Sequence, residues 1–108
     1  MQGVNIDATD MAKMTPLHFA CLKGKESAVK MLIKNGCDVA ARDMAEYNGL
    51  HFAALNGHHG TCTILIDGGS LLDERDKLGN TALMLSSCKA KEKTVEVLAS
   101  SLLLAHSD

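Results

Sequence analysis

The stretch "TPLHFACLKGKESAVKMLIKNG", residues 15–36, decides the fold because the chain repeats it. Residues 48–69, "NGLHFAALNGHHGTCTILIDGG", carry the same pattern 33 residues later. A third copy at 81–102, "TALMLSSCKAKEKTVEVLASSL", keeps the register more loosely. The identities between the first two copies include Leu17, His18, Phe19, Ala20, Leu22 and Gly24, which return as Leu50, His51, Phe52, Ala53, Leu55 and Gly57. A fixed period of this length indicates a chain built from stacked structural units.

Within one unit the apolar residues return at helical spacing. They form two groups in the first copy, one around Leu17 and Cys21 and one around Val29 and Ile33. Thr15 is suited to cap a helix, and Pro16 suits the first helical position, where a missing N–H costs nothing. Gly24 and Gly36 follow the two apolar groups and end two short helices.

The pattern therefore predicts three pairs of helices. The expected ranges are 16–23 and 26–34 with a polar loop to 47, then 49–56 and 59–67, then 82–89 and 92–101. One such pair cannot bury its apolar face alone, so the neighbouring pairs must supply the core between them.

A 33-residue period that contains "TPLHFA" resembles the ankyrin repeat, and the resemblance covers essentially the whole chain. It implies an all-α solenoid of stacked helix-turn-helix units joined by finger loops that resemble β-hairpins. It also implies a single domain over 1–108, divided into a closing loop and finger of a preceding repeat at 1–14 and three repeats at 15–47, 48–80 and 81–108. The residues that carry the family pattern are Thr15, Pro16, Leu17, His18, Ala20, Gly24, His51 and Gly57.

Three of the five histidines, His51, His58 and His59, lie close together in the sequence and raise the question of a metal site. The resemblance implies that His18 and His51 hydrogen-bond neighbouring backbone, that His58 belongs to a Gly-His pair of the family, and that His59 faces solvent. A zinc site needs three or four ligands at workable spacing, whereas His51 and His58 would lie about 10 Å apart along one helix. We expect no metal, no cofactor and no enzymatic activity, since no catalytic motif is present either.

Composition limits the classes of partner. The chain has 108 residues and a formal net charge of −2, which gives no reason to expect nucleic acid or a membrane as the partner. The start, "MQGVNIDATD", lacks the basic and apolar regions of a secretion signal. The four cysteines contain no C-x-x-C, so we interpret them as buried or half-buried thiols in a reducing compartment, the cytoplasm or nucleus.

The resemblance implies a non-enzymatic module that binds a partner protein or peptide, with no small-molecule substrate, on a concave face formed by the fingers and first helices. The residues at those positions are Met11, Met14, Leu22, Lys23, Arg42, Met44, Tyr47, Leu55, Asn56, Arg75, Lys77, Leu78, Asn80 and Lys89. Methionine suits adaptable binding surfaces, and Tyr47 is a candidate anchor. Arg42 and Arg75 would favour an acidic ligand. The alternative is that some of the methionines pack against the neighbouring finger and the arginines are only solvated.

Some positions depart from the family pattern. Lys13 and Glu46 occupy a finger position that favours glycine and that only Gly79 keeps, so the first two fingers are expected either to strain a positive φ or to differ in shape from the third. The pair Asn48-Gly49 replaces Thr-Pro and is expected to weaken that helix start.

The two ends suggest missing neighbours. "GVNIDATD" at 3–10 aligns with "GCDVAARD" at 36–43, which led us to the hypothesis that the chain was cut from a longer array. Leu102, Leu103 and Leu104 either fold back as a cap or expect another repeat or a second chain, so self-association is possible. Two other functions stay open: a structural spacer without a specific ligand, and a zinc- or redox-responsive module built on His58, His59 and the cysteines.

Overall fold

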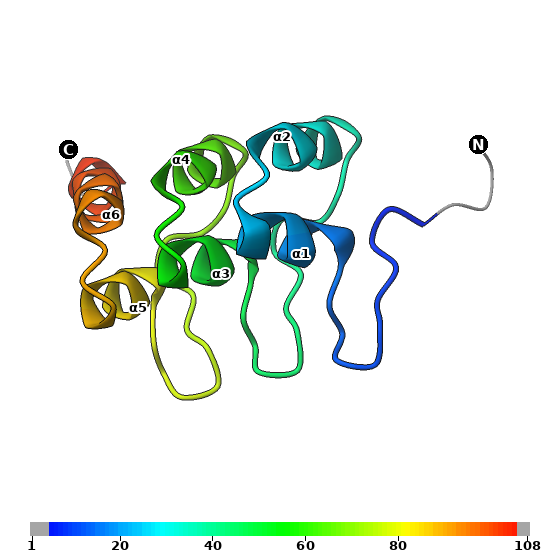
Figure 1. Cartoon of the computed structure of the whole chain (residues 1–108), viewed down its shortest axis with the longest axis horizontal. Coiled ribbons are helices and arrows are strands. Elements are labelled where there is room, and N and C mark those ends of the chain that lie inside the picture. The colour runs from blue at the N-terminus through cyan, green and yellow to red at the C-terminus, as the bar shows by residue number, and fades with distance from the viewer. Residues whose placement is uncertain (1–4, 106–108) are drawn as a thin grey trace.

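The computed structural model describes residues 5–105, and within that range it holds six helices and no strand. In Figure 1 they form two rows, with α1, α3 and α5 in one and α2, α4 and α6 in the other. The loops between successive helix pairs hang from the first row as parallel fingers. The helices are α1 (Pro16–Lys23), α2 (Glu26–Lys34), α3 (Gly49–Leu55), α4 (His59–Asp67), α5 (Ala82–Cys88) and α6 (Glu92–Ala105). The all-α stack of helix pairs is therefore confirmed. Parts of two predicted segments, 1–4 of the closing loop and 106–108 of the last repeat, lie outside the described residues.

The predicted helix bounds agree with the structure at α1, α2 and α4, and α3 and α5 end one residue earlier than expected. The exception is α6, which runs to Ala105 instead of ending at 101. The first two helix pairs are followed by Gly36 and Gly69, which take φ values of 84° and 100° and turn the chain away. The equivalent position in the third repeat is Leu102, which lies within α6; leucine is a good helix former, so the helix continues.

The first helix of each of the first two pairs starts with a reciprocal cap. The Thr15 hydroxyl accepts from the His18 N–H at 3.3 Å, while His18 Nδ1 accepts from the Thr15 N–H at 2.9 Å. Asn48 and His51 make the same two bonds, both at 2.9 Å. The expectation that Asn48-Gly49 would weaken this helix start stays a prediction; the cap itself forms, since an asparagine side chain caps a helix as well as threonine does.

The core lies between the rows and between successive pairs. It is built from small and branched side chains, among them Leu17, Cys21, Leu50 and Leu65, with Leu98 closing it in α6. The first-row helices pack on one another in order, α1 on α3 and α3 on α5, and so do α2, α4 and α6. Each helix therefore packs on helices one or two places away along the chain. None of the helices within 5–105 has the length and apolar character needed to span a membrane.

The three fingers share one turn. In each, an aspartate Oδ1 accepts two backbone N–H groups, from the residues two and four positions later. In the second finger, for example, Asp43 Oδ1 accepts from Ala45 and Tyr47 at 2.9 Å each. The first and third fingers use Asp10 and Asp76 in the same way.

Lys13 and Glu46 occupy the finger position that glycine holds in the third finger. Both take a φ of 62°, and Gly79 takes a φ of 88°. Of the two expected outcomes, the strained positive φ is therefore the one observed, and the expected difference in shape was wrong. The hydrogen bonds of the aspartate hold the turn against the strain of a non-glycine residue in the left-handed region.

Candidate functional site

The fingers are joined edge to edge by backbone hydrogen bonds. The Met44 N–H donates to the Ala12 carbonyl at 3.0 Å, and the Lys77 N–H donates to the Ala45 carbonyl at 2.9 Å. Figure 1 shows all three fingers pointing the same way from the first row of helices. Their tips thus form a continuous edge whose spacing is fixed by the stack.

The fingertips present apolar side chains to solvent. Met11 is 98% exposed, Met44 is 61% exposed and Leu78 is 88% exposed. Met11, Met44 and Leu78 are therefore not packed away against a neighbouring finger, whereas Met14 is half-buried at the base of the first finger, in keeping with the alternative that some of the methionines pack. We call Met11, Met44 and Leu78 the fingertip row.

Arg42 joins the second and third fingers. Its Nη2 pairs with Glu74 Oε1 at 2.9 Å, and its Nη1 lies 3.3 Å from Glu46 Oε1 and donates to the Arg75 carbonyl at 2.8 Å. Two carboxylates of the chain already satisfy this guanidinium, so Arg42 is poorly placed to attract an acidic ligand. Glu74 was not singled out from the sequence, although it lies directly before Arg75, the residue one repeat after Arg42.

Arg75 and the tyrosine of the second finger have different environments. Arg75 is exposed, and its Nη1 donates to the Gly79 carbonyl at 2.7 Å. Tyr47 is half-buried, with its ring centroid 5.1 Å from that of Phe52 and 5.4 Å from that of His51. Burial and the nearby carboxylates of Asp76 and Asp43 raise the pKa of Tyr47. Tyr47 therefore supports the second finger against α3, and its removal should also affect stability.

The remaining predicted residues lie at the finger bases and at the ends of the first-row helices. Lys23, Asn56 and Lys89 are exposed at or just beyond the ends of α1, α3 and α5, while Leu22 and Leu55 are half-buried there. Lys77 is exposed in the third finger, and Asn80 is half-buried, with Nδ2 donating to Asp76 Oδ2 at 3.3 Å. The asparagine thus contributes mainly to the turn.

The signature histidines tie helices to loops. His18 Nε2 lies 2.9 Å from the Ala41 carbonyl, and His51 Nε2 lies 2.9 Å from the Glu74 carbonyl. Because Nδ1 of each ring accepts a backbone N–H, Nε2 must carry the proton and donate. Burial lowers the pKa of His51 despite its hydrogen bond to Glu74. The backbone-bonding role expected for both residues is confirmed.

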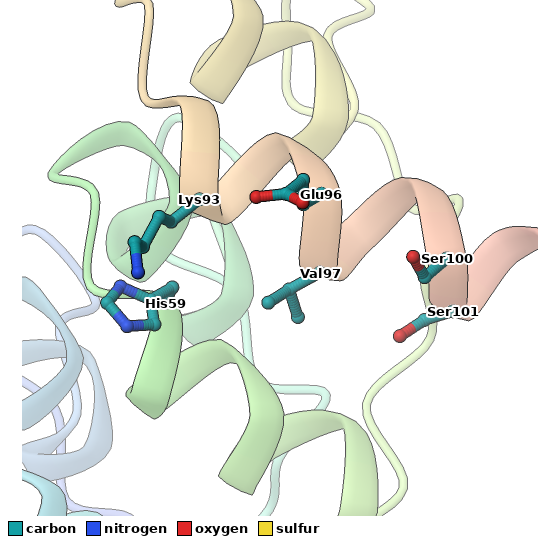
Figure 2. A pocket seen from close by; sticks show the side chains of 6 residues that line it. All are labelled: His59, Lys93, Glu96, Val97, Ser100 and Ser101. Carbon is teal, nitrogen blue, oxygen red and sulfur yellow. The ribbon is translucent and has the colours of Figure 1, made fainter.

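The other two described histidines lie where neighbouring repeats meet. His58 Nε2 lies 3.0 Å from the Leu22 carbonyl, across the junction between the first two repeats. His59 is exposed, as expected, and lines a shallow cavity of about 430 Å³ between α4 and α6. Figure 2 shows the Lys93 amine pointing toward the His59 ring, with Glu96 further along α6. Among residues 5–105, no three histidine, cysteine or acidic side chains are grouped closely enough to hold a metal ion.

The cysteines divide into three covered thiols and an exposed one. Cys21 and Cys62 are fully buried, and burial raises the pKa of Cys62 to about 12 and that of Cys21 still further from its usual value. Cys37 is half-buried, and burial raises its pKa as well. Cys88, the last residue of α5, is exposed, which corrects the interpretation of all four as buried or half-buried. Thiolates are the redox nucleophiles, so burial makes Cys21 and Cys62 poor redox groups.

Comparison with known families gives two matches. A family model described as "Ankyrin repeats (many copies)" matches residues 2–33 and 17–66. A second, described as "Ankyrin repeats (3 copies)", matches residues 43–106. No curated protein matches the chain.

Proposed function

The chain belongs to the ankyrin repeat family, and we propose that it binds a partner protein or peptide segment along its fingers and the adjoining ends of its first-row helices. Ankyrin repeat domains are generally non-enzymatic protein–protein interaction modules. In this proposal the chain acts by holding its partner, as an adaptor, targeting or regulatory segment.

The fingertip row is the observation that carries the proposal. Met11, Met44 and Leu78 expose apolar side chains from turns that are already fixed by aspartate hydrogen bonds and by bonds between fingers. A partner that covers these side chains gains apolar burial without ordering a flexible loop, which keeps the entropic cost of binding low. Exposed apolar groups gathered on one edge are typical of interaction surfaces.

The charges beside the fingertip row favour an acidic partner. Lys13 and Lys77 are exposed on the fingers, and Lys23 and Lys89 are exposed at the ends of the first-row helices. The acidic side chains of the fingers have partners within the fold. Glu46 lies 3.3 Å from Arg42, and Asp10, Asp43 and Asp76 each accept two backbone N–H groups. We therefore propose a partner segment with apolar side chains for the fingertips and acidic side chains flanking them, since complementary charge sets specificity and association rate.

A pull-down with matched variants tests this function. The test variant carries Met11→Ser, Met44→Ser and Leu78→Ser, and the control carries Met31→Ser and Leu71→Ser, which also replace exposed apolar residues but away from the fingertips. A protein captured by the wild type and the control should be lost by the test variant, and its dissociation constant with the purified test variant should rise at least about tenfold.

Circular dichroism and the melting temperature of each variant establish that the fold is intact. Equal capture by the test variant and the wild type would show that the partner binds elsewhere. Capture of no protein by any of the three would favour a structural spacer.

A further inference from the structure

The first helix pair leaves its outer side uncovered. In Figure 1 α1 and α2 lie at one end of the two rows. Helix α1 packs on α2 and α3, and α2 packs on α1 and α4, so no helix within residues 5–105 covers the outer side. Two large apolar side chains of this pair are exposed, Phe19 at 47% and Met31 at 65%. A groove of about 520 Å³ runs along α2, and its lining residues are Ser27, Lys30, Met31, Lys34 and Asn35.

The molecule itself shows what covers the equivalent side of the second pair. Phe52 and Ile64 take the positions of the two exposed side chains one repeat later, and both are half-buried. The Phe52 ring lies on α1, with its centroid 5.6 Å from that of His18, and Ile64 lines a groove of about 270 Å³ with residues of α2. The surface that the first pair exposes is therefore one on which, elsewhere in this chain, another helix pair packs.

The last helix pair presents a matching apolar side chain at the opposite end of the rows. Met84 of α5 takes the position that His18 holds in α1, and it is 45% exposed. Methionine packs favourably on aromatic rings. Met84 of one copy can therefore cover Phe19 of another, as His18 covers Phe52 within the chain.

The charges of the two end faces are complementary. At the junction of α2 and α4, Lys30 and Asp67 line the same groove, so these two positions lie close together. Glu96 of α6 takes the position of Lys30, and Lys34 of α2 takes the position of Asp67; both are exposed. In the same register, two copies would bring together the same pair of opposite charges with their places exchanged, and opposite charges attract.

The fingers supply a third matched pair. The N–H groups of Met44 and Lys77 each donate to a carbonyl of the preceding finger. The Met11 N–H and the Leu78 carbonyl take the equivalent positions at the two ends of the finger row, and neither has a backbone hydrogen bond within residues 5–105. One end of the row therefore offers a donor and the other end an acceptor.

We propose that a second copy of this chain docks its α5–α6 end on the α1–α2 end of the first, in the register of the junctions within the chain. The contact joins two different surfaces, so each copy keeps one free end and the assembly remains open. The row of fingers then continues from one copy to the next. The contact uses none of the fingertip side chains, so it is independent of the proposed partner binding.

One position makes this contact weaker than the internal junctions. A Cβ on Gly57 would lie 2.8 Å from Cδ of Lys91 in the next repeat. Ala90 takes the glycine position at the α5–α6 end, and Lys25 of the incoming copy takes the position of Lys91. The lysine side chain must move aside for the methyl group, so we expect a reversible association that requires a high concentration of the chain.

Sedimentation velocity on the full chain tests the assembly over about a hundredfold range of concentration, up to about 200 µM. The average mass of the wild type should rise with concentration and pass twice the monomer mass. Lys34→Glu and Glu96→Lys each place like charges at the contact, so each should raise the dissociation constant at least about fivefold. The variant with both changes on one chain restores opposite charges and should assemble like the wild type.

The control is Thr63→Lys, which adds a charge at the position of Lys30 and Glu96 in the middle pair, away from both ends. It should assemble like the wild type, and circular dichroism establishes that every variant is folded. A wild type that stays monomeric would overturn the proposal. So would a mass that stops at twice the monomer, which indicates a closed two-fold contact, or a double variant that assembles no better than the single ones.

Cross-linking tests the register, in a background with Cys37→Ser and Cys88→Ser that removes the two thiols that are not fully buried. Under mild oxidation, a chain with Phe19→Cys should form a disulfide with a chain carrying Met84→Cys, and not with a chain carrying Thr63→Cys. Equal cross-linking to both partners would show that the copies do not meet in the proposed register.

Discussion

The first two repeats and the third differ at one residue of the turn between the two helices of a pair. Gly24 and Gly57 occupy this position with φ values of 67° and 72°, and Ala90 occupies it in the third repeat with a φ of 55°. A Cβ on Gly24 would lie 2.6 Å from His58 Nδ1, and one on Gly57 would lie 2.8 Å from Lys91 Cδ. Both obstructing side chains belong to the next repeat. Within residues 5–105 no later helix pair packs beside Ala90, and the methyl group fits.

The histidine position shows the same contrast. His18 and His51 are buried and bonded to the loop that leads into the next finger. Met84 stands at this position in the third repeat, where it is exposed and its backbone N–H donates to the Thr81 hydroxyl at 3.3 Å. The glycine therefore serves the junction with the following repeat, and the histidine serves the loop that leads to the next finger. A helix pair without such a neighbour can fold with neither.

The largest effect should come from removing a histidine that bonds the finger loop. His51→Ala leaves the Asn48 N–H and the Glu74 carbonyl without partners in a buried site, and it also creates a cavity. We expect the free energy of unfolding to fall by about 3 kcal/mol or more. Met84→Ala, at the equivalent exposed position, should cost less than about 1 kcal/mol. Urea unfolding of both variants measures the difference, and similar losses would break the contrast between the repeats.

Gly24→Ala should have the next largest effect. The new Cβ is strained by the positive φ and collides with the His58 ring, which its bond to the Leu22 carbonyl holds in place. We expect a loss of about 2–3 kcal/mol. In a His58→Ala background the collision disappears, so the same substitution should cost only about 1 kcal/mol. Equal losses in the two backgrounds would show that the junction plays no part in selecting glycine.

Acid should affect the second repeat more than the third. Burial lowers the pKa of His51 in the folded chain, whereas an unfolded histidine titrates near 6.5. The unfolded state therefore binds more protons as the pH falls below about 6.5, and the folded state is destabilised by at most about 1.4 kcal/mol per pH unit. His51→Met, which copies the third repeat, should flatten the dependence of unfolding free energy on pH between about 7.5 and 5.5. An unchanged slope would contradict the role assigned to His51.

The smallest expected change is a gain. Ala90→Gly removes the strain of a non-glycine residue at positive φ, and it should raise the free energy of unfolding by about 0.5 kcal/mol. The reverse change, Gly57→Ala, should lower it by more than that, because Lys91 occupies the space. Thermal unfolding of the two variants side by side provides the measurement. A loss of stability in Ala90→Gly would show that the methyl group contributes packing that outweighs the strain.

The sequence was sufficient for features that depend on neighbours within one unit. The helix ranges, the cap at Thr15 and the backbone bonds of His18 follow from a period and a motif that both lie in the printed residues. The shared turn of the fingers was also within reach. Asp10, Asp43 and Asp76 recur one period apart, and aspartate side chains commonly bond the backbone two residues later.

Features that depend on contacts between units were harder to predict. Arg42 pairs with Glu74 of the neighbouring repeat. Its guanidinium is therefore not free to attract an acidic ligand at the fingers, which is the role that the sequence had predicted. The packing of the Tyr47 ring on the Phe52 ring likewise depends on how the second finger is positioned relative to α3. The continuation of α6 to Ala105 departs from the 33-residue period, because the third repeat has leucine at the position where glycine ends the region of the second helix in the other two.

The restriction of each helix to partners one or two places away bears on how the chain folds. Every helix contact can form by closing a short stretch of chain, so the entropy lost before the first stabilising contact is small. Folding can begin at any helix pair and spread to its neighbours, and we expect refolding within milliseconds. Local unfolding should likewise begin at one helix pair and spread to its neighbours. The end pairs should exchange their amide hydrogens faster than α3 and α4, which are held on both sides.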